Sequence, residues 1–482
     1  MNKFYDGKKG LLSVLFIVFL SIYQNVTAND VVAGAYYVST SGSDNNDGKL
    51  VNEGGSGPWL TIQHAAQTLV AGEIVYVREG IYSEPDPIDG STKIWGIRPK
   101  NSGSAGNYIS YVAYPDERVV LDTNFESPCI TLYGIKYVQI KGFEIRNCNG
   151  SGIWVKSGSG TENSNLILDE NLIHGIDGGS GSNVAGIRMD YVGHSTISNN
   201  IIYNIRVAGE HNGNAAGVLS YEMHNVIIEN NEFFDSYSGI FHKTPADSTQ
   251  KSGVFRKNLI HDTDRAIYFN TNETVPITGF HNGTEVYNNV VYNSGLFIYD
   301  HSYQSKAQST GLKVYNNTVI GADFGIRGFD KVEFYNNILV DKPGINTYYQ
   351  EHVFTDPGTR KAPGLILSDY NLYFPNFVAQ VGVYSNEKKV FNSLSEWQVS
   401  GFDGALFTID VSAPGPDEHS AVEDPLFINK EVNNYRLQPQ SPAKTMGING
   451  GVIGAYITDN DVIGPEVSRF LIPPAAPVLE VK

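Results

Sequence analysis

The sequence predicts an all-β solenoid, a parallel β-helix with an N-terminal capping helix, on the evidence of two recurring phrases. The first phrase places an asparagine between two short apolar stretches and returns at intervals of 20 to 31 residues, at Asn171, Asn200, Asn231, Asn258, Asn289, Asn317 and Asn337. The second phrase precedes it and reads GIWVK, GIRMD, GVLSY, GIFHK, AIYFN, FIYDH and GIRGF, starting at residues 152, 186, 217, 239, 266, 297 and 325. Repeats of this length are typical of solenoids, in which each repeat forms one coil.

The asparagine phrase predicts a corner in each coil. Apolar residues alternate with polar ones before the asparagine and resume after it, which is the period of a strand that ends at a turn. Asparagines in register at such a corner stack with each side-chain amide bonded to the next, as in stacked strands. We therefore expect consecutive coils over residues 125–349, with the seven asparagines in one ladder.

The second phrase predicts one inward and two outward columns of side chains. The inward, aliphatic column is Ile153, Ile187, Val218, Ile240, Ile267, Ile298 and Ile326, and its alternation partners point outward. The first outward column is Trp154, Arg188, Leu219, Phe241, Tyr268, Tyr299 and Arg327, and the second is Lys156, Asp190, Tyr221, Lys243, Asn270, His301 and Phe329. These columns are expected to form an exposed face, while His242 and Asp300 turn inward and need partners there.

The two ends of the repeat region have different signals. The segment TIQHAAQTLVAGEIVYV, residues 61–77, predicts an amphipathic helix followed by a strand, so residues 29–124 are expected to hold the cap and the first coils. The asparagine phrase is lost after residue 349. Residues 350–471 are therefore expected to close the solenoid, and residues 472–482 to form a Pro-rich tail.

The N-terminal residues predict export. Basic residues up to Lys9, an apolar run from Leu11 to Tyr23 and small residues up to Ala28 are typical of a signal peptide, so residues 1–28 are expected to be removed. The apolar run is shorter than the ~20 residues that a membrane-spanning helix needs. We expect a secreted monomer.

The net charge limits the classes of partner, and the two cysteines allow two structural roles. The formal net charge of −17 argues against nucleic acid and anionic membranes, but an anionic polysaccharide can still bind at a local basic cleft or through a divalent cation. Cys129 and Cys148 are the only cysteines. They form either a disulfide between neighbouring coils or two small residues of the core.

Three groups of motifs carry a resemblance. They are YYVSTSGSDNNDG with PWLTIQHAAQTL near the N-terminus, the repeated NNxI coils, and DPLFINKEVNNYRLQPQSPA with IGAYI near the C-terminus. On these motifs the chain resembles secreted bacterial right-handed parallel β-helix proteins, which include pectate, alginate and chondroitin lyases and some glycoside hydrolases. The resemblance covers nearly the whole mature chain and implies a carbohydrate ligand bound along one parallel sheet.

The outward columns supply candidate residues for such a site. Sugar rings would stack on Trp154, Phe241, Tyr268 and Tyr299, carboxylates would bind Arg188 and Arg327, and Asn270 would line the same groove. The long connections DGGSGSN, VAGEHNGN, KTPADSTQKSG and NTNETVPITGFHNG are expected to wall it.

Lys243 is the candidate base. Cleavage of a uronic-acid polymer by β-elimination needs a base for the proton beside the carboxylate and positive charge to stabilise the enolate-like species. In the lyases that the chain resembles, a groove-facing lysine does this beside Ca²⁺, often with an arginine on the next coil. Here the next coil offers Asn270, and the nearest arginine is Arg265. Tyr221, or the more distant His301, is the candidate proton donor.

Other readings of the same face remain open. Asp190, Glu210 and Glu222 are candidate oxygen ligands for Ca²⁺. A glycoside hydrolase would instead use a carboxylate pair, either Asp190 with Glu222 or Asp264 with Asp300, whose separation predicts its stereochemistry. A C5-epimerase would share the proton abstraction of a lyase, and a non-catalytic glycan-binding protein would use the aromatic residues alone.

Overall fold

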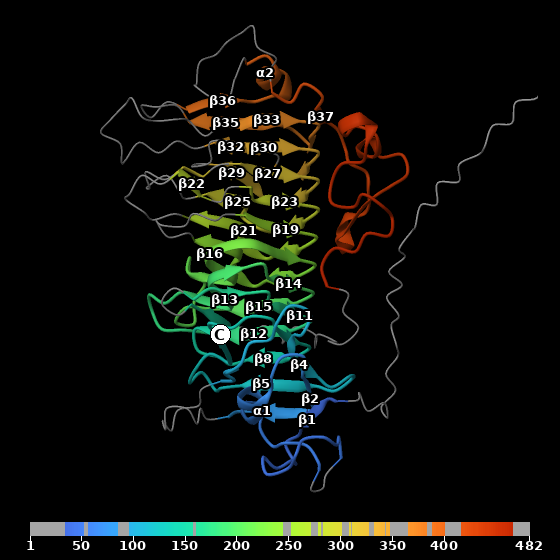
Figure 1. Cartoon of the computed structure of the whole chain (residues 1–482). Coiled ribbons are helices and arrows are strands. Elements are labelled where there is room, and N and C mark those ends of the chain that lie inside the picture. The colour runs from blue at the N-terminus through green and yellow to red at the C-terminus, as the bar shows by residue number, and fades with distance from the viewer. Residues whose placement is uncertain are drawn as a thin grey trace, which may run out of the picture.

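The computed structural model describes residues 34–52, 56–84, 96–157, 161–243, 252–270, 278–280, 283–300, 308–309, 311–326, 332–342, 344–347, 365–382, 388–400 and 416–465. Strands stack along one axis from β1 near the N-terminus to β36 at the other end (Figure 1). The chain is a right-handed parallel β-helix, in which strands pair in parallel from coil to coil. The expected signal peptide and the Pro-rich tail lie outside the described residues.

Each central coil contributes three strands. One such coil holds β18 (Ser236–Lys243), β19 (Ser252–Arg256) and β20 (Leu259–His261). They pair with β21 (Thr263–Asn270), β23 (Glu285–Tyr287) and β24 (Val290–Tyr292) of the next coil. The first two columns of strands belong to one long sheet and the third to a second sheet.

The long sheet also contains β1 (Tyr36–Val38), β2 (Ile74–Val77), β4 (Ile109–Ala113), β6 (Ile130–Tyr133), β7 (Val138–Lys141), β9 (Ser151–Lys156), β10 (Asn163–Ser164), β11 (Ile167–Asp169), β13 (Val184–Gly193), β14 (Thr196–Ser198), β16 (Ala215–Glu229), β25 (Leu296–Asp300), β27 (Leu312–Tyr315), β29 (Asp323–Ile326), β30 (Val332–Tyr335), β32 (Gly344–Thr347), β33 (Leu365–Asp369), β35 (Val378–Gly382) and β36 (Lys388–Phe391). The second sheet also contains β3 (Gly80–Tyr82), β5 (Val119–Asp122), β8 (Glu144–Arg146), β12 (Leu172–Ile176), β15 (Ile201–Ile205), β17 (Glu232–Phe234), β28 (Thr318–Ile320), β31 (Ile338–Val340), β34 (Leu372–Phe374) and β37 (Ala421–Val422). Two short pairs complete the strands, β22 (Thr278–Phe280) with β26 (Gln308–Ser309) and β38 (Phe427–Asn429) with β39 (Asn434–Leu437). The helices are α1 (Ile62–Thr68) and α2 (Leu394–Gln398), with 3₁₀ turns at Lys430–Val432, Pro442–Lys444 and Ile448–Gly450.

The asparagine ladder is confirmed. All seven asparagines are fully buried, and each donates from its side-chain nitrogen to the Oδ1 atom of the next one at 2.9–3.1 Å. The residue before each of them has a positive φ, from Glu170 at 52° to Asn336 at 57°. Asparagine tolerates this left-handed conformation, which explains why the phrase contains two adjacent asparagines in most coils.

The ladder continues one coil further than expected. Asn337 donates to Asn371, so parallel coils extend beyond residue 349 through β33, β34 and β35. The boundary at 349 was therefore wrong. In this coil Tyr370 instead of asparagine takes the positive φ, which hides the phrase in the sequence.

Replacing a central ladder residue should be costly. In Asn258→Leu, the amide groups of Asn231 lose their acceptor, and the carbonyl of Ile228 loses its donor. Unpaired buried groups of this kind cost about 1–3 kcal/mol, so we expect that decrease in the free energy of unfolding, measured by urea denaturation. An exposed change, Asn392→Leu, is the control, and equal stability of the two variants would contradict the ladder's role.

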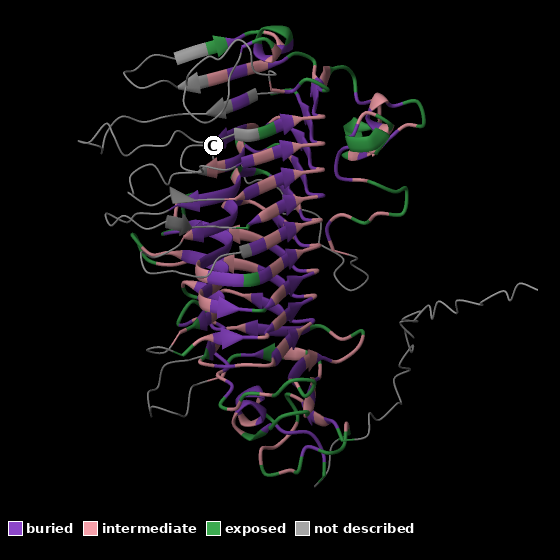
Figure 2. Cartoon of the chain, turned by 45° about the horizontal axis from the view of Figure 1, so that its top comes forward, coloured by how far each residue is buried: buried purple, intermediate pink, exposed green. Residues whose placement is uncertain are grey.

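The inward column is confirmed from Ile153 to Ile298, and the buried residues form one continuous interior along the coil axis (Figure 2). The coil that contains β29 differs, because Ile298 pairs with Phe324 instead of Ile326, and Phe324 fills the core. The register is therefore shifted by two residues. Because side chains alternate with a period of two, a shift of two residues does not exchange the inward and outward faces of the strand. His242 faces the core as expected and shares a hydrogen bond of 2.8 Å between its Nδ1 atom and the Ser220 hydroxyl. The side chain of Asp300 lies outside the described residues.

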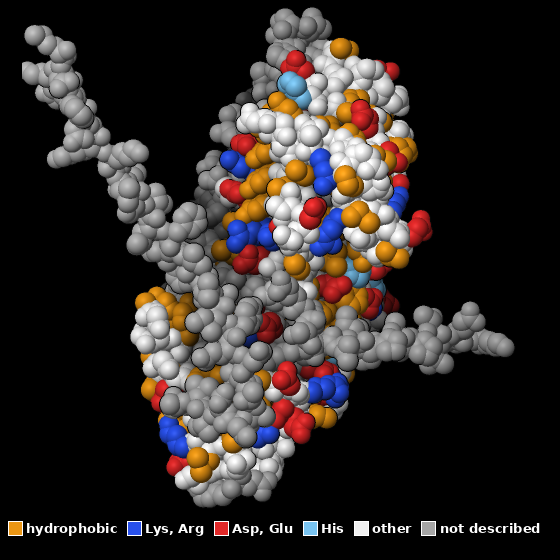
Figure 3. Space-filling model, turned by 90° about the vertical axis from the view of Figure 1, so that its right-hand side faces the viewer, with side chains coloured by type: hydrophobic (Ala, Val, Ile, Leu, Met, Phe, Trp, Pro, Cys, Tyr) orange, Lys and Arg blue, Asp and Glu red, His pale blue; other side chains and the backbone are white. Residues whose placement is uncertain are grey.

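The predicted helix and strand at the N-terminal end of the solenoid are present, whereas the C-terminal segment differs from the prediction. α1 and β2 form as predicted within residues 61–77, and α1 places Ile62, Ala65 and Ala66 in the core. Its role as a cap stays a prediction. At the other end, β37 pairs with β34 and extends the second sheet, and the segment that follows β37 packs against this sheet through Tyr435, Leu437 and Ile453 (Figure 1). Figure 3 faces this side of the molecule. No helix within the described ranges is long and apolar enough to cross a bilayer.

Cys129 and Cys148 form a disulfide, which decides between the two readings of this pair.

Candidate active site

A column of glycines bends the sheet that carries the candidate residues. A Cβ atom added to Gly152, Gly186, Gly217 or Gly239 would lie 2.7, 2.3, 2.5 or 2.8 Å from a neighbouring atom. Ala185, just before Gly186, lies in an outer cluster, whereas Ile187, just after it, lies in the core. Residues i and i+2 of a straight strand share a face, so the strand changes direction at the glycine.

The outer surface on the two sides of this glycine column forms a groove. Lys243 lies after the bend on β18, whereas Asn183 and Asn214 directly precede the bent segments of β13 and β16. The Lys243 amine nevertheless donates to the Oδ1 atoms of Asn183 at 2.7 Å and Asn214 at 3.4 Å. Since these bonds join the two sides across the outer face, that face is concave. We call it the groove, formed by the outer faces of β9, β13, β16, β18 and β21.

Lys243 has the environment of a weakly basic amine. It is half-buried, and its ammonium lies 4.7 Å from the ring centre of Phe241 and 5.8 Å from that of Tyr221. Burial, followed by repulsion from the Arg188 guanidinium, lowers the pKa of Lys243 to about 8. At this pKa a substantial fraction of the amine is neutral near pH 8, and a neutral amine can accept a proton.

The residues opposite Lys243 on the neighbouring strands are Tyr221 and Asn270. Tyr221 is half-buried, and burial raises the pKa of its hydroxyl, which therefore stays protonated at neutral pH. Asn270 is only 7% exposed, and among the described residues its Oδ1 atom has no hydrogen-bond partner. The structure thus brings together the predicted base, the predicted proton donor and an unused acceptor, while His301 lies outside the described residues.

Asp190 holds two other candidate residues in place. Its carboxylate accepts from Trp154 Nε1 at 2.8 Å and from Arg188 Nε at 3.2 Å. The Arg188 guanidinium in turn lies 5.0 Å from the ring centre of Trp154 and 5.5 Å from that of Tyr221. Asp190 is therefore a positioning residue for a cation and an indole that both face the groove.

The expected calcium ligands are not assembled. Among the described residues no three His, Cys, Asp or Glu side chains lie close enough together to hold a metal ion. Asp190 is engaged by Arg188 and Trp154, and Glu210 is exposed in a turn that pairs with Val207. Asp190, Glu210 and Glu222 thus do not form the predicted set. A calcium requirement stays a prediction, which activity after chelation and after calcium is restored would test.

The aromatic column is more enclosed than expected. Leu219, Phe241 and Tyr268 are 0%, 1% and 6% exposed and pack together as an outer apolar cluster, so only Trp154 and Tyr299 offer partly exposed rings. The expectation of an open aromatic face was wrong here. Phe241 and Tyr268 stack with ring centres 4.1 Å apart and form the floor of the groove.

Of the other two candidate arginines, Arg265 faces the groove and Arg327 is not in the predicted register. The guanidinium of Arg265 lies 4.3 Å from the ring centre of Tyr268 and 4.1 Å from that of Tyr299, so it faces the same surface one coil beyond Lys243. Arg327 lies outside the described residues, and the position opposite Tyr299 is Gly325. The predicted alignment of Arg327 with this column was therefore wrong, because the register shifts by two residues in the coil that contains β29.

Sequence reasoning missed Asn183 and Asn214. They are the last residues of the loops DGGSGSN and VAGEHNGN, and each stands three residues before a glycine of the bend, in NVAG and NAAG. This repeated Asn-x-Ala-Gly spacing, in two consecutive coils, is the signal that could have identified them. These two predicted wall loops do border the groove.

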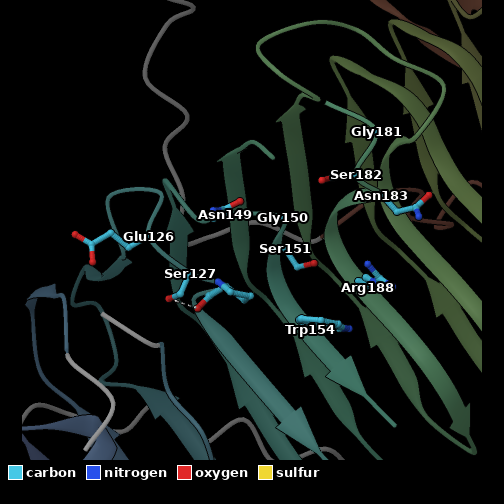
Figure 4. A pocket seen from close by; sticks show the side chains of 11 residues that line it. Glu126, Ser127, Asn149, Gly150, Ser151, Trp154, Gly181, Ser182, Asn183 and Arg188 are labelled. Atoms are coloured by element: carbon cyan, nitrogen blue, oxygen red, sulfur yellow. Dashed lines mark hydrogen bonds between the residues drawn. The ribbon is translucent and has the colours of Figure 1, made fainter. Parts of the chain in front are cut away.

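An open pocket of about 510 Å³ adjoins this site. Its lining includes Trp154 and Arg188 together with Asn149, Ser151 and Asn183 (Figure 4). Because Asn183 and Arg188 also contact or influence Lys243, the pocket continues the groove toward the N-terminal coils.

The fold is a β-helix of the kind also found in polysaccharide lyases, as comparisons with known proteins show. Residues 36–238 match the family model "Pel9A-like, right handed beta helix region". The solved structure of pectate lyase Pel9A superposes with a TM-score of 0.54 at 15% identity, over 88% of this chain and 96% of that one. A rhamnogalacturonan lyase gives a TM-score of 0.47 at 14% identity, over 87% and 96% of the two chains. The uncharacterized protein YwoF of Bacillus subtilis (strain 168) is 24% identical over 90% of this chain and 97% of its own. The chain thus resembles right-handed β-helix proteins of the polysaccharide lyase type.

Proposed function

We propose that this protein is a polysaccharide lyase that cleaves a uronic-acid-containing glycan by β-elimination. The observation that carries the proposal is Lys243, a half-buried amine with a pKa lowered to about 8, which faces a groove beside Arg188 and Tyr221. A base, a cation and a protonated hydroxyl are the three groups that elimination from a uronate needs.

The proposed reaction assigns one role to each group. A uronate binds with its carboxylate toward Arg188, and the neutral amine of Lys243 takes the proton from C5. The C5–H electron pair forms the C4=C5 double bond as the bond from C4 to the glycosidic oxygen breaks. Tyr221 gives its proton to that oxygen, so the products are an unsaturated uronate and a new sugar hydroxyl.

Asn183 and Asn214 would orient the base. A neutral amine has two hydrogens and one lone pair, and the two asparagine Oδ1 atoms accept from this nitrogen. With both hydrogens directed to them, the lone pair points elsewhere, into the groove. The Oδ1 atom of Asn270, which has no partner within the part of the chain that the structure describes, would accept from a sugar hydroxyl at the same place.

A substrate screen tests the function. The protein is incubated with pectate, alginate, glycosaminoglycans and sulfated algal glycans, and both ultraviolet absorbance and new reducing ends are measured. We expect both signals to rise together on one uronate polymer. Reducing ends without absorbance would indicate hydrolysis, and binding without either signal would indicate a glycan-binding protein. Uronate inversion without cleavage would indicate an epimerase.

The proposal includes export and action as a monomer on an extracellular glycan. The Cys129–Cys148 disulfide supports export, since disulfides persist in oxidising compartments. The N-terminal sequence of the secreted protein, expected to begin near Asn29, and its mass in solution test these two points.

A further inference from the structure

The Cys129–Cys148 disulfide joins two segments of the chain that line the pocket beside the groove. The two residues before Cys129 and the two after Cys148, residues 127–128 and 149–150, all belong to the lining (Figure 4). Both cysteines belong to the hydrophobic core. The disulfide therefore crosslinks this part of the pocket wall from its buried side.

The loop DGGSGSN, residues 177–183, is anchored on the segment that contains Cys148. At the start of the loop, the Asp177 amide donates to the Cys148 carbonyl at 3.2 Å, and the Gly150 amide donates to the Asp177 carbonyl at 2.6 Å. Just beyond its end, the Ala185 amide donates to the Gly150 carbonyl at 3.0 Å. The position of this loop thus depends on the segment that the disulfide holds.

The loop VAGEHNGN, residues 207–214, is anchored in turn on the first loop. The Ala208 amide donates to the Gly178 carbonyl at 2.7 Å. The Gly209 amide donates to the carboxylate of Asp177 at 3.0 Å. The two loops are therefore stacked, coil on coil, above the segment that the disulfide holds.

Each of the two stacked loops ends on a residue that contacts Lys243. Asn183 is the last residue of the first loop and Asn214 the last of the second. Their Oδ1 atoms accept from the Lys243 amine at 2.7 and 3.4 Å. Both loops contain glycines, which have more backbone conformations than other residues, so they need fixed anchor points to hold a side chain in one place. Contacts thus connect the disulfide to the nitrogen of Lys243 without a gap.

We propose that the Cys129–Cys148 disulfide is a positioning element of the site, because it fixes the base of the two stacked loops that direct Lys243 into the groove. This inference rests on the proposed elimination for the role of Lys243. It adds that the site is fully assembled only in the oxidised protein. Loss of the disulfide lowers turnover, while the asparagine ladder and the paired strands keep the coils folded.

The double variant Cys129→Ala/Cys148→Ala tests the proposal with two readouts. The first is amide hydrogen exchange of the free protein, which should be faster in residues 177–183 and 207–214 and unchanged in β30 and β31. The second is turnover, measured on whichever of pectate, alginate, glycosaminoglycans and sulfated algal glycans gives the largest ultraviolet signal with the wild-type protein. We expect kcat to fall by about 10–100-fold, since a displacement of ~1 Å caused far from the chemistry can cost about 100-fold.

Asn337→Leu is the matched control, because it lowers stability through the asparagine ladder in a coil far from these loops. Its melting temperature should fall, as that of the double variant does, but its kcat and the exchange of both loops should equal those of the wild-type protein. A crosslink with a merely structural role would give the same result as this control.

The wild-type protein refolded with dithiothreitol gives a second measurement. Its S–S bond takes up two electrons and two protons to become two thiols, while dithiothreitol is oxidised to a cyclic disulfide. We expect kcat to be low in this reduced protein and to return when an oxidant forms the disulfide again.

The outcomes separate this inference from the proposed function. Unchanged exchange of both loops in the double variant, or a kcat equal to that of the wild-type protein, would overturn the positioning role. Failure of both the double variant and the reduced protein to fold would also overturn it, because the disulfide would then serve the fold instead of the site. If the wild-type protein forms no unsaturated product on any of these polymers, elimination fails, and the exchange of the loops alone decides whether the disulfide fixes them.

Discussion

Lys243→Ala should lose about 10²–10⁴-fold in turnover while it still binds the glycan, because a positioned base contributes that much to proton transfer. The lysine side chain lies on the outer face of β18, so the core is unaffected. Lys243→Arg should not restore activity, since a guanidinium stays protonated. The formation of unsaturated products, measured by ultraviolet absorbance, checks the loss. The matched control is Lys313→Ala, which removes a lysine from β27 and should retain full activity.

The pH dependence provides a second readout of the same residue. Lys243 works as a neutral base, so kcat/KM should rise with pH through about 8 and level off above it, well below the ordinary lysine pKa of ~10.4. Arg188→Gln removes a cation that lowers this pKa, so its profile should shift to higher pH. Near-wild-type turnover of Lys243→Ala, or a profile that falls as pH rises through 8, would contradict the assignment.

The regular part of the molecule could be predicted because its residues repeat. Asn258 occupies a buried ladder whose hydrogen bonds only asparagine supplies, and Gly217 occupies a bend where a Cβ would lie 2.5 Å from the ring of Phe233. Such positions tolerate one residue type, so their spacing reveals the coil. The same logic placed Tyr221, Lys243 and Asn270 on neighbouring strands, as the structure confirms.

The contents of the groove were less predictable, because they depend on contacts across the bend. Alternation shows that Phe241 and Tyr268 point outward, but not that they pack into a buried cluster. It also shows that Asp190 points outward, but not that Trp154 and Arg188 occupy its carboxylate and prevent its use in a calcium site. Asn183 contacts Lys243 from 60 residues away in the chain, a distance at which local patterns carry no information.

The end of the asparagine ladder could not be predicted from the sequence either. The residue that ends it, Asp417, is the site of the second prediction, which concerns stability. Asn371, its last asparagine, donates at 3.0 Å to the fully buried carboxylate of Asp417, which is 46 residues away. The same carboxylate accepts four further side-chain hydrogen bonds, of 2.6–3.0 Å, from Ser368, Tyr373, Trp397 and Ser420. Asp417 therefore joins the last coil, α2 and the start of the C-terminal segment.

Asp417→Ala should lower the free energy of unfolding by about 3–5 kcal/mol. The substitution leaves several buried donors without an acceptor, and each costs about 1–3 kcal/mol, less what local rearrangement recovers. Urea denaturation measures the change. Asp459→Ala, which removes a carboxylate that is 90% exposed, is the control and should change stability by less than about 1 kcal/mol.

Asp417→Asn keeps the effect measurable if the alanine variant does not fold. The amide retains one acceptor oxygen but turns an NH₂ group toward the remaining donors, so its loss should be smaller than that of alanine and larger than that of the control. A loss below about 1 kcal/mol in both Asp417 variants would show that the carboxylate does not hold these segments together. Since Lys243 lies several coils away, the folded Asp417→Asn protein should keep its glycan affinity, which separates stability at this end from function in the groove.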